Sequence, residues 1–441
     1  TDHLERGPVV ITKGHAARVT DNTGRDYIDA MAGLWCVNIG HGRQEMVDAI
    51  TEQASKLAYY HIFFSMSNEP AIRLADEVLQ VAPKHMSKVF FCNSGSEAND
   101  TQVKIAWYYN NLRGLPQKKK IISRHRGYHG VTVVAASMTG LPANHQSFNL
   151  PLDGFLHVTA PHHYWNAEEG ESETEFSDRL AKELEATIER EGPSTIAAFI
   201  AEPVMGAGGV VPPPEGYFPR IQAILRKHDI LFIADEVICG FGRLGTMFGS
   251  DLYNLEPDMM SIAKGLTSAY VPMSAAIISE KVWEVLRDGS PDTGPFAHGY
   301  TYGGHPLAAA AGLKTLEIMK REKLVDNAQK VGNYLQKRLR ETFSDHPLVG
   351  EIRGVGLMAG VELVADKATK AAFEPSDKIG PRVTQLLLEE GVIHRTVLNT
   401  ICYSPPLVMT EADVDEMVER GERAIHKMAD ELLREGLWKA A

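Results

Sequence analysis

Short apolar runs alternate with amphipathic stretches through the first part of the chain. Runs such as "KVFFCN", "ILFIADEV" and "SAAIIS" have the length and the β-branched or aromatic content of buried strands. Stretches such as "SEANDTQVKIAWYYNNLRG" and "YFPRIQAILRKHD" carry apolar residues at helical spacing. This alternation predicts an α/β unit with a largely parallel sheet, helices on both of its faces, and ligands at the carboxyl ends of its strands.

The pattern changes near residue 306. A long helical stretch over about 306–340 leads to the apolar run "EIRGVGLMAGVELV", a helix from about 378, and the short runs "GVIHRTV" and "TICYSPPL". A last amphipathic helix follows Thr410 and Asp413, which have the spacing of an N-cap residue and its N3 partner. This part of the chain is predicted to form a smaller α+β domain.

The length of 441 residues exceeds what one hydrophobic core usually supports, so more than one domain is expected. Residues 51–305 are assigned to the large domain, and residues 306–441 to a linking helix and the small C-terminal domain. Residues 1–50 hold a short strand and a glycine-rich loop. They are expected to contribute to the small domain and to the entrance of the active site.

Composition and charge narrow the classes of function. The net charge of -12 disfavours binding to nucleic acid or to an anionic membrane surface. No apolar stretch reaches the length of a membrane span, and no signal peptide is evident, so a cytoplasmic location is expected. The four cysteines are far apart, which argues against a disulfide framework and against paired metal ligands: Cys36, Cys92, Cys239 and Cys402.

Three apolar strands end in residues that can carry chemistry. Asp235 follows "ILFIA", where an ionised carboxylate needs a partner from elsewhere in the fold or from a bound group. In "FCNSGSEAND", Gly95 and Ser96 could open a helix toward an anion, or serve only as its start. In "SIAKGL", Lys264 is either a surface lysine or a desolvated amine suited to Schiff-base chemistry.

A phosphate-binding helix start, a carboxylate and an amine at one edge of a sheet are the three anchors of pyridoxal phosphate. The phosphate binds at the helix N-terminus, the pyridine nitrogen pairs with Asp235, and the aldehyde reacts with Lys264. The buried carboxylate thereby gains its partner. A metal site is not expected, because His162 and His163 have no third ligand at useful spacing.

Longer motifs extend this interpretation to a family. "AEPV" (201–204), "ADEVICGFGR" (234–243), "SIAKGL" (261–266) and "HGYTYGGHP" (298–306) resemble class III, fold-type-I, pyridoxal-phosphate-dependent aminotransferases in order and spacing. More narrowly, "AGLWC", "YHIFF", "GYHG" and "YSPPL" resemble the omega-transaminases that use pyruvate as amino acceptor. The resemblance covers nearly the whole chain.

The resemblance implies a role for each matching residue. Lys264 forms the Schiff base and moves the proton, while Asp235 keeps the ring nitrogen protonated. The cofactor is further held at its phosphate by Gly95, Ser96 and, from the neighbouring subunit of a homodimer, Thr301, and around its ring by Tyr128, His129 and Val237. The substrate pocket is lined by Leu34, Trp35, Phe63, Tyr128 and Arg395, the last being a mobile clamp for a carboxylate.

The activity implied is ping-pong transfer of an amino group from a primary amine or ω-amino acid to pyruvate. The partners are these small molecules and a second copy of the chain, with active sites at the subunit interface and a tetramer as an alternative. Ile238 departs from ornithine and 4-aminobutyrate aminotransferases, which carry Gln at that position. β-Alanine, taurine and diamines remain open as donors. Glu202 either helps to order the cofactor site or only caps its strand.

Parts of the sequence are also compatible with three other functions. A nicotinamide dehydrogenase is suggested by "GAGGVV" (206–211), but "PPPEG" follows in place of a helix, and the third spaced glycine is missing. A non-enzymatic scaffold would not need both Lys264 and Asp235. An aminomutase or a decarboxylase could use the same set of cofactor contacts.

Overall fold

The computed structural model describes residue 4 and residues 7–439 of the chain, and its centre is a seven-stranded sheet. The strand order is β4-β10-β9-β8-β7-β5-β6. Neighbours from β9 to β6 are parallel, and β10 is antiparallel to both of its neighbours, so the mostly parallel sheet is confirmed. The strands are β4 (Met86–Cys92), β5 (Lys120–Arg124), β6 (Phe155–Val158), β7 (Ile196–Ala201), β8 (Leu231–Asp235), β9 (Met259–Ile262) and β10 (Ser274–Ser279).

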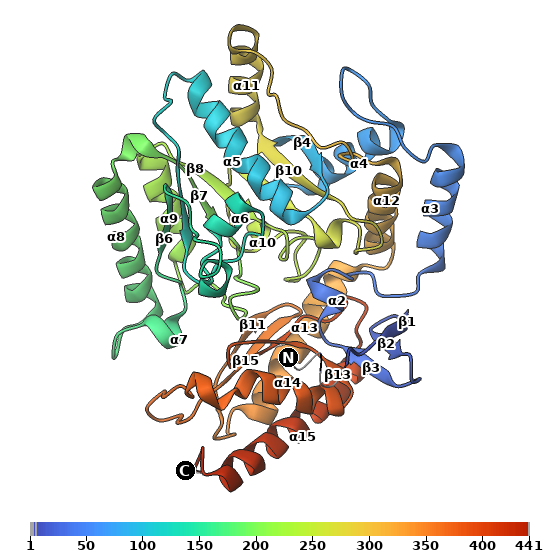
Figure 1. Cartoon of the computed structure of the whole chain (residues 1–441), viewed down its shortest axis with the longest axis vertical. Helices are drawn as coiled ribbons and strands as arrows, with labels where there is room; N and C mark the ends of the chain where they lie inside the picture. The colour runs from blue at the N-terminus through green and yellow to red at the C-terminus, as the bar shows by residue number, and fades with distance from the viewer. Residues whose placement is uncertain (1–3, 5–6, 440–441) are drawn as a thin grey trace.

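Helices cover both faces of this sheet (Figure 1). In β8, Leu231 and Ile233 pack in one apolar cluster with α5, while Phe232 packs in another with α8 and α9. This division follows from the strand period of two, which sends successive side chains to opposite faces. The helices of the large domain include α3 (Gln44–Lys56), α4 (Glu69–Val81), α5 (Gly95–Leu112), α6 (Val133–Met138), α8 (Glu173–Glu191), α9 (Tyr217–Lys227) and α11 (Glu280–Thr293).

The C-terminal part forms a second, antiparallel sheet of order β11-β12-β15-β14, packed with helices. Its elements are α13 (Leu324–Phe343), β11 (Val349–Val355), β12 (Met358–Leu363), α14 (Ile379–Glu389), β14 (Arg395–Val397), β15 (Thr400–Tyr403) and α15 (Glu411–Glu435). The predicted capping box is confirmed, since the Thr410 side chain accepts from the backbone of Asp413 at the start of α15. These elements are the smaller α+β unit expected from the sequence.

The single helix predicted over about 306–340 is wrong in one respect, because the stretch forms two helices. The first, α12 (Pro306–Arg321), ends before Glu322, and α13 begins at Leu324. Lys323 lies between them in the left-handed region with φ 52°, which a continuous right-handed helix cannot accommodate. The side chain of Glu322 is held by Arg43, with 2.7 Å between Nη2 and Oε2.

The N-terminal strands lie beside the C-terminal part of the chain in Figure 1. The strands β1 (Ile11–His15), β2 (Arg18–Asp21) and β3 (Asp26–Asp29) form a sheet with β13 (Val392–Ile393). In this sheet β3 runs parallel to β13, and Ile28 is opposite Val392. The domain boundaries at residues 50 and 305 remain a prediction. Among the described residues, no helix is both long and apolar enough to cross a membrane.

Candidate active site

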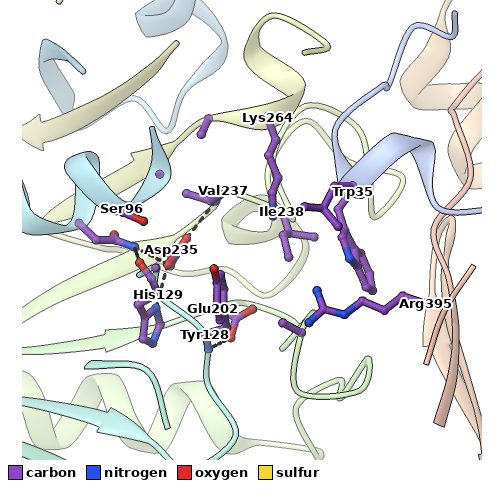
Figure 2. Close-up of a pocket in the computed structure, with 16 residues that line it drawn as sticks. Trp35, Ser96, Tyr128, His129, Glu202, Asp235, Val237, Ile238, Lys264 and Arg395 are labelled. Atoms are coloured by element: carbon purple, nitrogen blue, oxygen red, sulfur yellow. Dashed lines mark hydrogen bonds and ion pairs between the residues drawn. The ribbon is translucent and has the colours of Figure 1, made fainter. Parts of the chain in front are cut away.

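A cavity of about 190 Å³ opens at the carboxyl ends of the central strands. The turn from β4 into α5, the end of β8 and the residues after β9 all contribute to its wall. In Figure 2 Lys264 extends into the cavity between Asp235 and His129 on one side and Trp35 and Arg395 on the other. Its lining comprises Leu34, Trp35, Gly95, Ser96, Asn99, Tyr128, His129, Gly130, Glu202, Ala207, Asp235, Val237, Ile238, Ala263, Lys264 and Arg395.

Asp235 is buried, and its carboxylate accepts several hydrogen bonds. Oδ2 accepts from His129 Nδ1 and from Asn99 Nδ2, each at 2.8 Å. Oδ1 accepts from the backbone N–H of Val237 at 3.1 Å. A carboxylate offers about four acceptor positions, so one position on Oδ1 is left for a donor in the cavity.

His129 lines the cavity and follows Tyr128 in the chain. Its Nδ1 faces Asp235, and its Nε2 is buried with no hydrogen-bond partner among the described residues. An ionised carboxylate can only accept hydrogen bonds, so the Nδ1–H of His129 is the donor to Asp235. The side chain therefore supports Asp235.

Lys264 lies two residues after the end of β9 (Met259–Ile262), and its backbone is in the left-handed region with φ 44°. A non-glycine residue in this region stores strain, which is common at functional sites. Desolvation lowers the pKa of its amine, while the nearby Asp235 raises it. The net shift is downward, which favours the neutral amine that Schiff-base chemistry requires.

The helix start of α5 is shaped for a phosphate group. The Oγ of Ser96 accepts from the backbone N–H of Val131 at 3.0 Å. A Cβ at Gly95 would lie 3.1 Å from Val237, and one at Gly130 would lie 2.4 Å from the Oγ of Ser96. The two glycines thus let Val237 and the loop at Gly130 pack closely against the helix start, whose backbone N–H groups at the cavity wall favour an anion.

Glu202 connects two loops that border the cavity. Its Oε1 accepts from the backbone N–H of Tyr128 at 3.0 Å, and its Oε2 from that of Gly206 at 2.8 Å. Burial raises the pKa of this carboxyl group. These contacts support an ordering role for Glu202 over that of a strand cap. These contacts place Tyr128 at the cavity wall. Val237, which follows the end of β8, also lines the cavity.

The loop that carries Leu34 and Trp35 is held in an uncommon conformation. Ala32, Gly33 and Trp35 all have positive φ, at 48°, 66° and 63°. The carboxylate of Asp29 fixes the loop by accepting from the backbone N–H of Gly33 at 2.7 Å. Trp35 is thereby buried at the cavity wall, and Leu34 stays exposed at its rim.

Two predicted residues, Phe63 and Thr301, do not line this cavity. Thr301 is exposed, and its carbonyl accepts from the hydroxyl of Tyr59 at 2.7 Å. Phe63 is half-buried, and its ring packs where a Cβ at Gly299 would lie, 2.5 Å away. Within one chain neither side chain reaches the residues around Lys264.

Asn99 lines the cavity but was not predicted as a site residue. It lies three residues after Ser96 in α5, so both face the same side of that helix. The three-residue spacing from Ser96 was the signal in the sequence that could have identified Asn99.

The described residues contain no group of three His, Cys, Asp or Glu side chains that could hold a metal ion. His162 pairs with Glu351, while His163 bonds to the carbonyl of Glu171.

The family follows from comparison with known proteins. The model for "Aminotransferase class-III" matches residues 2–425. The chain belongs to the class-III aminotransferases. It is therefore a pyridoxal-phosphate-dependent enzyme of fold type I, and the dehydrogenase and scaffold alternatives fall away.

Relatives of this class-III aminotransferase carry different substrate names. A diaminobutyrate–2-oxoglutarate transaminase of Halomonas elongata is 52% identical over 98% of this chain and 93% of its own. A mitochondrial gamma aminobutyrate transaminase of Solanum lycopersicum is 48% identical over 96% and 83%. The solved omega transaminase of Pseudomonas jessenii, in complex with PMP, is 50% identical, with a TM-score of 0.95 over 97% and 94% of the two chains.

The residues of this aminotransferase fit the cofactor of its family. The helix start at Gly95 and Ser96, the open acceptor position on Asp235 and the amine of Lys264 lie around one cavity. When bound, pyridoxal phosphate supplies a ring that withdraws electrons from the carbon that loses its proton. Asp235 would keep the proton on the ring nitrogen, and Lys264 would attach the aldehyde and carry the proton.

Proposed function

We propose that this aminotransferase moves an amino group from a primary amine or ω-amino acid to pyruvate, giving alanine. The supporting observation is the set of side chains on the substrate side of the cavity. The apolar wall is made by Leu34, Trp35, Ile238 and Ala207, and Arg395 contributes a guanidinium group to the cavity. Such a wall suits an amine without a carboxylate, and the guanidinium suits the single carboxylate of pyruvate.

A larger keto acid with two carboxylates would need a second cation. Two other buried arginines near the site, Arg353 and Arg243, are already engaged. Arg353 pairs with Glu351 at 2.7 Å and with Glu362 at 2.8 Å, and also donates to the carbonyl of Gly209. Arg243 donates to backbone carbonyls and to Asn38. Neither lines the cavity, which supports a monocarboxylate acceptor.

The diaminobutyrate and gamma aminobutyrate transaminases among the relatives favour a second candidate. Diaminobutyrate or 4-aminobutyrate as donor, with 2-oxoglutarate as acceptor, is the alternative. Incubating the holoenzyme with one amine donor and either keto acid, and measuring alanine and glutamate formed, separates the two. Alanine as the dominant product supports the proposal, and glutamate as the dominant product overturns it.

Arg395→Ala should weaken the half-reaction with pyruvate by about 10- to 150-fold. A hydrogen-bonded contact to a charged group contributes about 1.5–3 kcal/mol, and lysine cannot reproduce the planar fork of arginine. The half-reaction with an amine that lacks a carboxylate should change much less. Stopped-flow absorbance measures each half-reaction separately.

Arg395→Lys is the matched variant, because it keeps the charge and loses the fork. It should restore only part of the pyruvate rate. Equal losses in both half-reactions, or no loss with pyruvate, would show that Arg395 is not the carboxylate clamp.

We also propose a homodimer with active sites at its interface. An apolar surface surrounds the two segments that carry Phe63 and Thr301. Its exposed members are Tyr59, Tyr60, Phe64, Met66 and Tyr302. Large exposed apolar patches mark interaction surfaces, and Thr301 on this surface is free to reach the phosphate site of a second copy.

Thr301→Ala should make loss of cofactor on dilution faster, by about tenfold. The physical reason is that removal of a hydrogen bond to a phosphate weakens retention in the dimer. The measurement is the rate of cofactor release at several protein concentrations, with Thr369→Ala, a threonine in the small domain, as control. A release rate equal to that of the wild type would place Thr301 outside the cofactor site.

A further inference from the structure

Asn99 makes two contacts that join separate parts of the cofactor site. Its side chain is 1% exposed. Its Nδ2 donates to the carbonyl of His129 at 2.7 Å and to Oδ2 of Asp235 at 2.8 Å. A side-chain amide has two N–H donors, so both are committed. One planar group therefore fixes the backbone of the loop containing Tyr128 and the carboxylate at the end of β8.

The acceptor positions of Asp235 show what this contact does. Oδ2 accepts hydrogen bonds from Asn99 and His129, and these two bonds occupy its acceptor positions. Oδ1 receives only the N–H of Val237, at 3.1 Å. The two donors on Oδ2 thereby determine which oxygen keeps a free acceptor position, and how the carboxylate plane is turned.

The position of Asn99 in α5 also relates Asp235 to the proposed phosphate site. The same helix begins at Gly95 and Ser96, which form the proposed phosphate site. Ser96 and Asn99 are three residues apart, which is a rise of about 4.5 Å along the helix. A single rigid element thus sets the spacing between the phosphate site and the carboxylate that faces the ring nitrogen.

We infer that Asn99 is a positioning residue that aims Asp235 at the pyridine nitrogen and ties this aim to the phosphate site. It acts through Asp235 and His129 and does not itself exchange a proton. Its remaining atom, Oδ1, is buried with no hydrogen-bond partner among the described residues, so the amide is held there by its donors alone. The inference concerns the cofactor site and holds whichever amine and keto acid are used.

The test uses the full chain loaded with pyridoxal phosphate that carries ¹⁵N in its ring. In the wild type, the ¹⁵N chemical shift should report a protonated ring nitrogen over the working pH range. In Asn99→Ala the apparent pKa of that nitrogen should fall, and the cofactor should dissociate about tenfold faster. The kcat should fall more than KM changes, because substrate contacts are not removed.

A binding comparison separates positioning from general damage. The 1-deaza analogue of pyridoxal phosphate has C–H in place of the ring nitrogen, so wild-type protein should bind it more weakly than the cofactor. This preference should shrink about tenfold in Asn99→Ala. Asn110→Ala is the matched control, because Asn110 is equally buried in α5 but donates only to the carbonyl of Ala106. It should keep the wild-type preference.

Asn99→Leu provides a second variant of nearly unchanged size. It removes both N–H donors from Asp235 and from the carbonyl of His129 without adding a charge. The ¹⁵N shift and the analogue preference should move in the same direction as in Asn99→Ala. If both variants keep the wild-type shift and preference, or if Asn110→Ala loses them equally, Asn99 has only a structural role.

Discussion

Replacing Lys264 with alanine is expected to abolish steady-state turnover, a loss of more than about 10⁴-fold. The variant loses the amine that attaches the aldehyde and also the group that moves the proton, and general acid–base catalysis alone is worth about 10²–10⁴-fold. Cofactor should still bind, since the helix start at Ser96 and the carboxylate of Asp235 remain. Product formation over many turnovers and the visible absorbance of the bound cofactor are the measurements.

Two observations make this result specific to Lys264. Adding a small alkylamine should restore part of the proton transfer in Lys264→Ala, because a free amine fits the space left by the side chain. Lys118→Ala is the control, since Lys118 is also buried but donates to the carbonyl of Asp229, just before the amino end of β8, whereas Asp235 lies at the carboxyl end of that strand. Ready multiple turnover by Lys264→Ala without added amine would remove Lys264 from the mechanism.

Asp235→Asn should leave the fold intact and lower the rate of both half-reactions by about 100-fold. The substitution removes the charge that keeps the ring nitrogen protonated, and each pKa unit lost is about 1.4 kcal/mol. The neighbouring donors are also affected, because an amide at position 235 must turn its NH₂ either toward His129 and Asn99 or toward the backbone N–H of Val237. Single-turnover kinetics with each substrate measures the loss.

The next residue supplies a matched control for Asp235. Glu236 is fully buried as well, but it accepts from the backbone N–H of Gly249 and Ser250, and it does not line the cavity. Burial raises the pKa of Glu236 to about 7. Glu236→Gln should therefore keep the rate of both half-reactions. An Asp235→Asn rate within a few-fold of the wild type would contradict the assigned role.

Much of the large domain could be predicted because its chemistry follows the ends of apolar strands. Asp235 ends β8, Lys264 lies two residues after β9, and Ser96 lies four residues after β4. The patterns of these strands are local, and the sheet brings their ends together. The family resemblance added Arg395 and Trp35, whose local patterns alone indicate only a surface arginine and a core aromatic residue. Both line the cavity.

The features that sequence did not predict depend on contacts between distant residues. Asn99 and Asp235 are 136 positions apart, and no local pattern distinguishes a helix asparagine that supports a carboxylate from one that packs. The strand β6 has only four residues and a mixed burial pattern, so it is too short for a strand period to be recognised in the sequence. The break between α12 and α13 lies at Lys323, whose backbone is left-handed. Because this residue is not a glycine, the sequence does not mark the break.

The parallel pairing of β3 with β13 has a consequence for the order in which the molecule folds. Arg25, next to β3, bonds to the carbonyl of Glu389, which is 364 positions later. During synthesis the chain leaves the ribosome from its N-terminal side, so β3 emerges long before its partner exists. We therefore expect these early strands to be among the last to dock. Until then β3 presents an open edge, and a nascent chain is most exposed to mispairing at that edge.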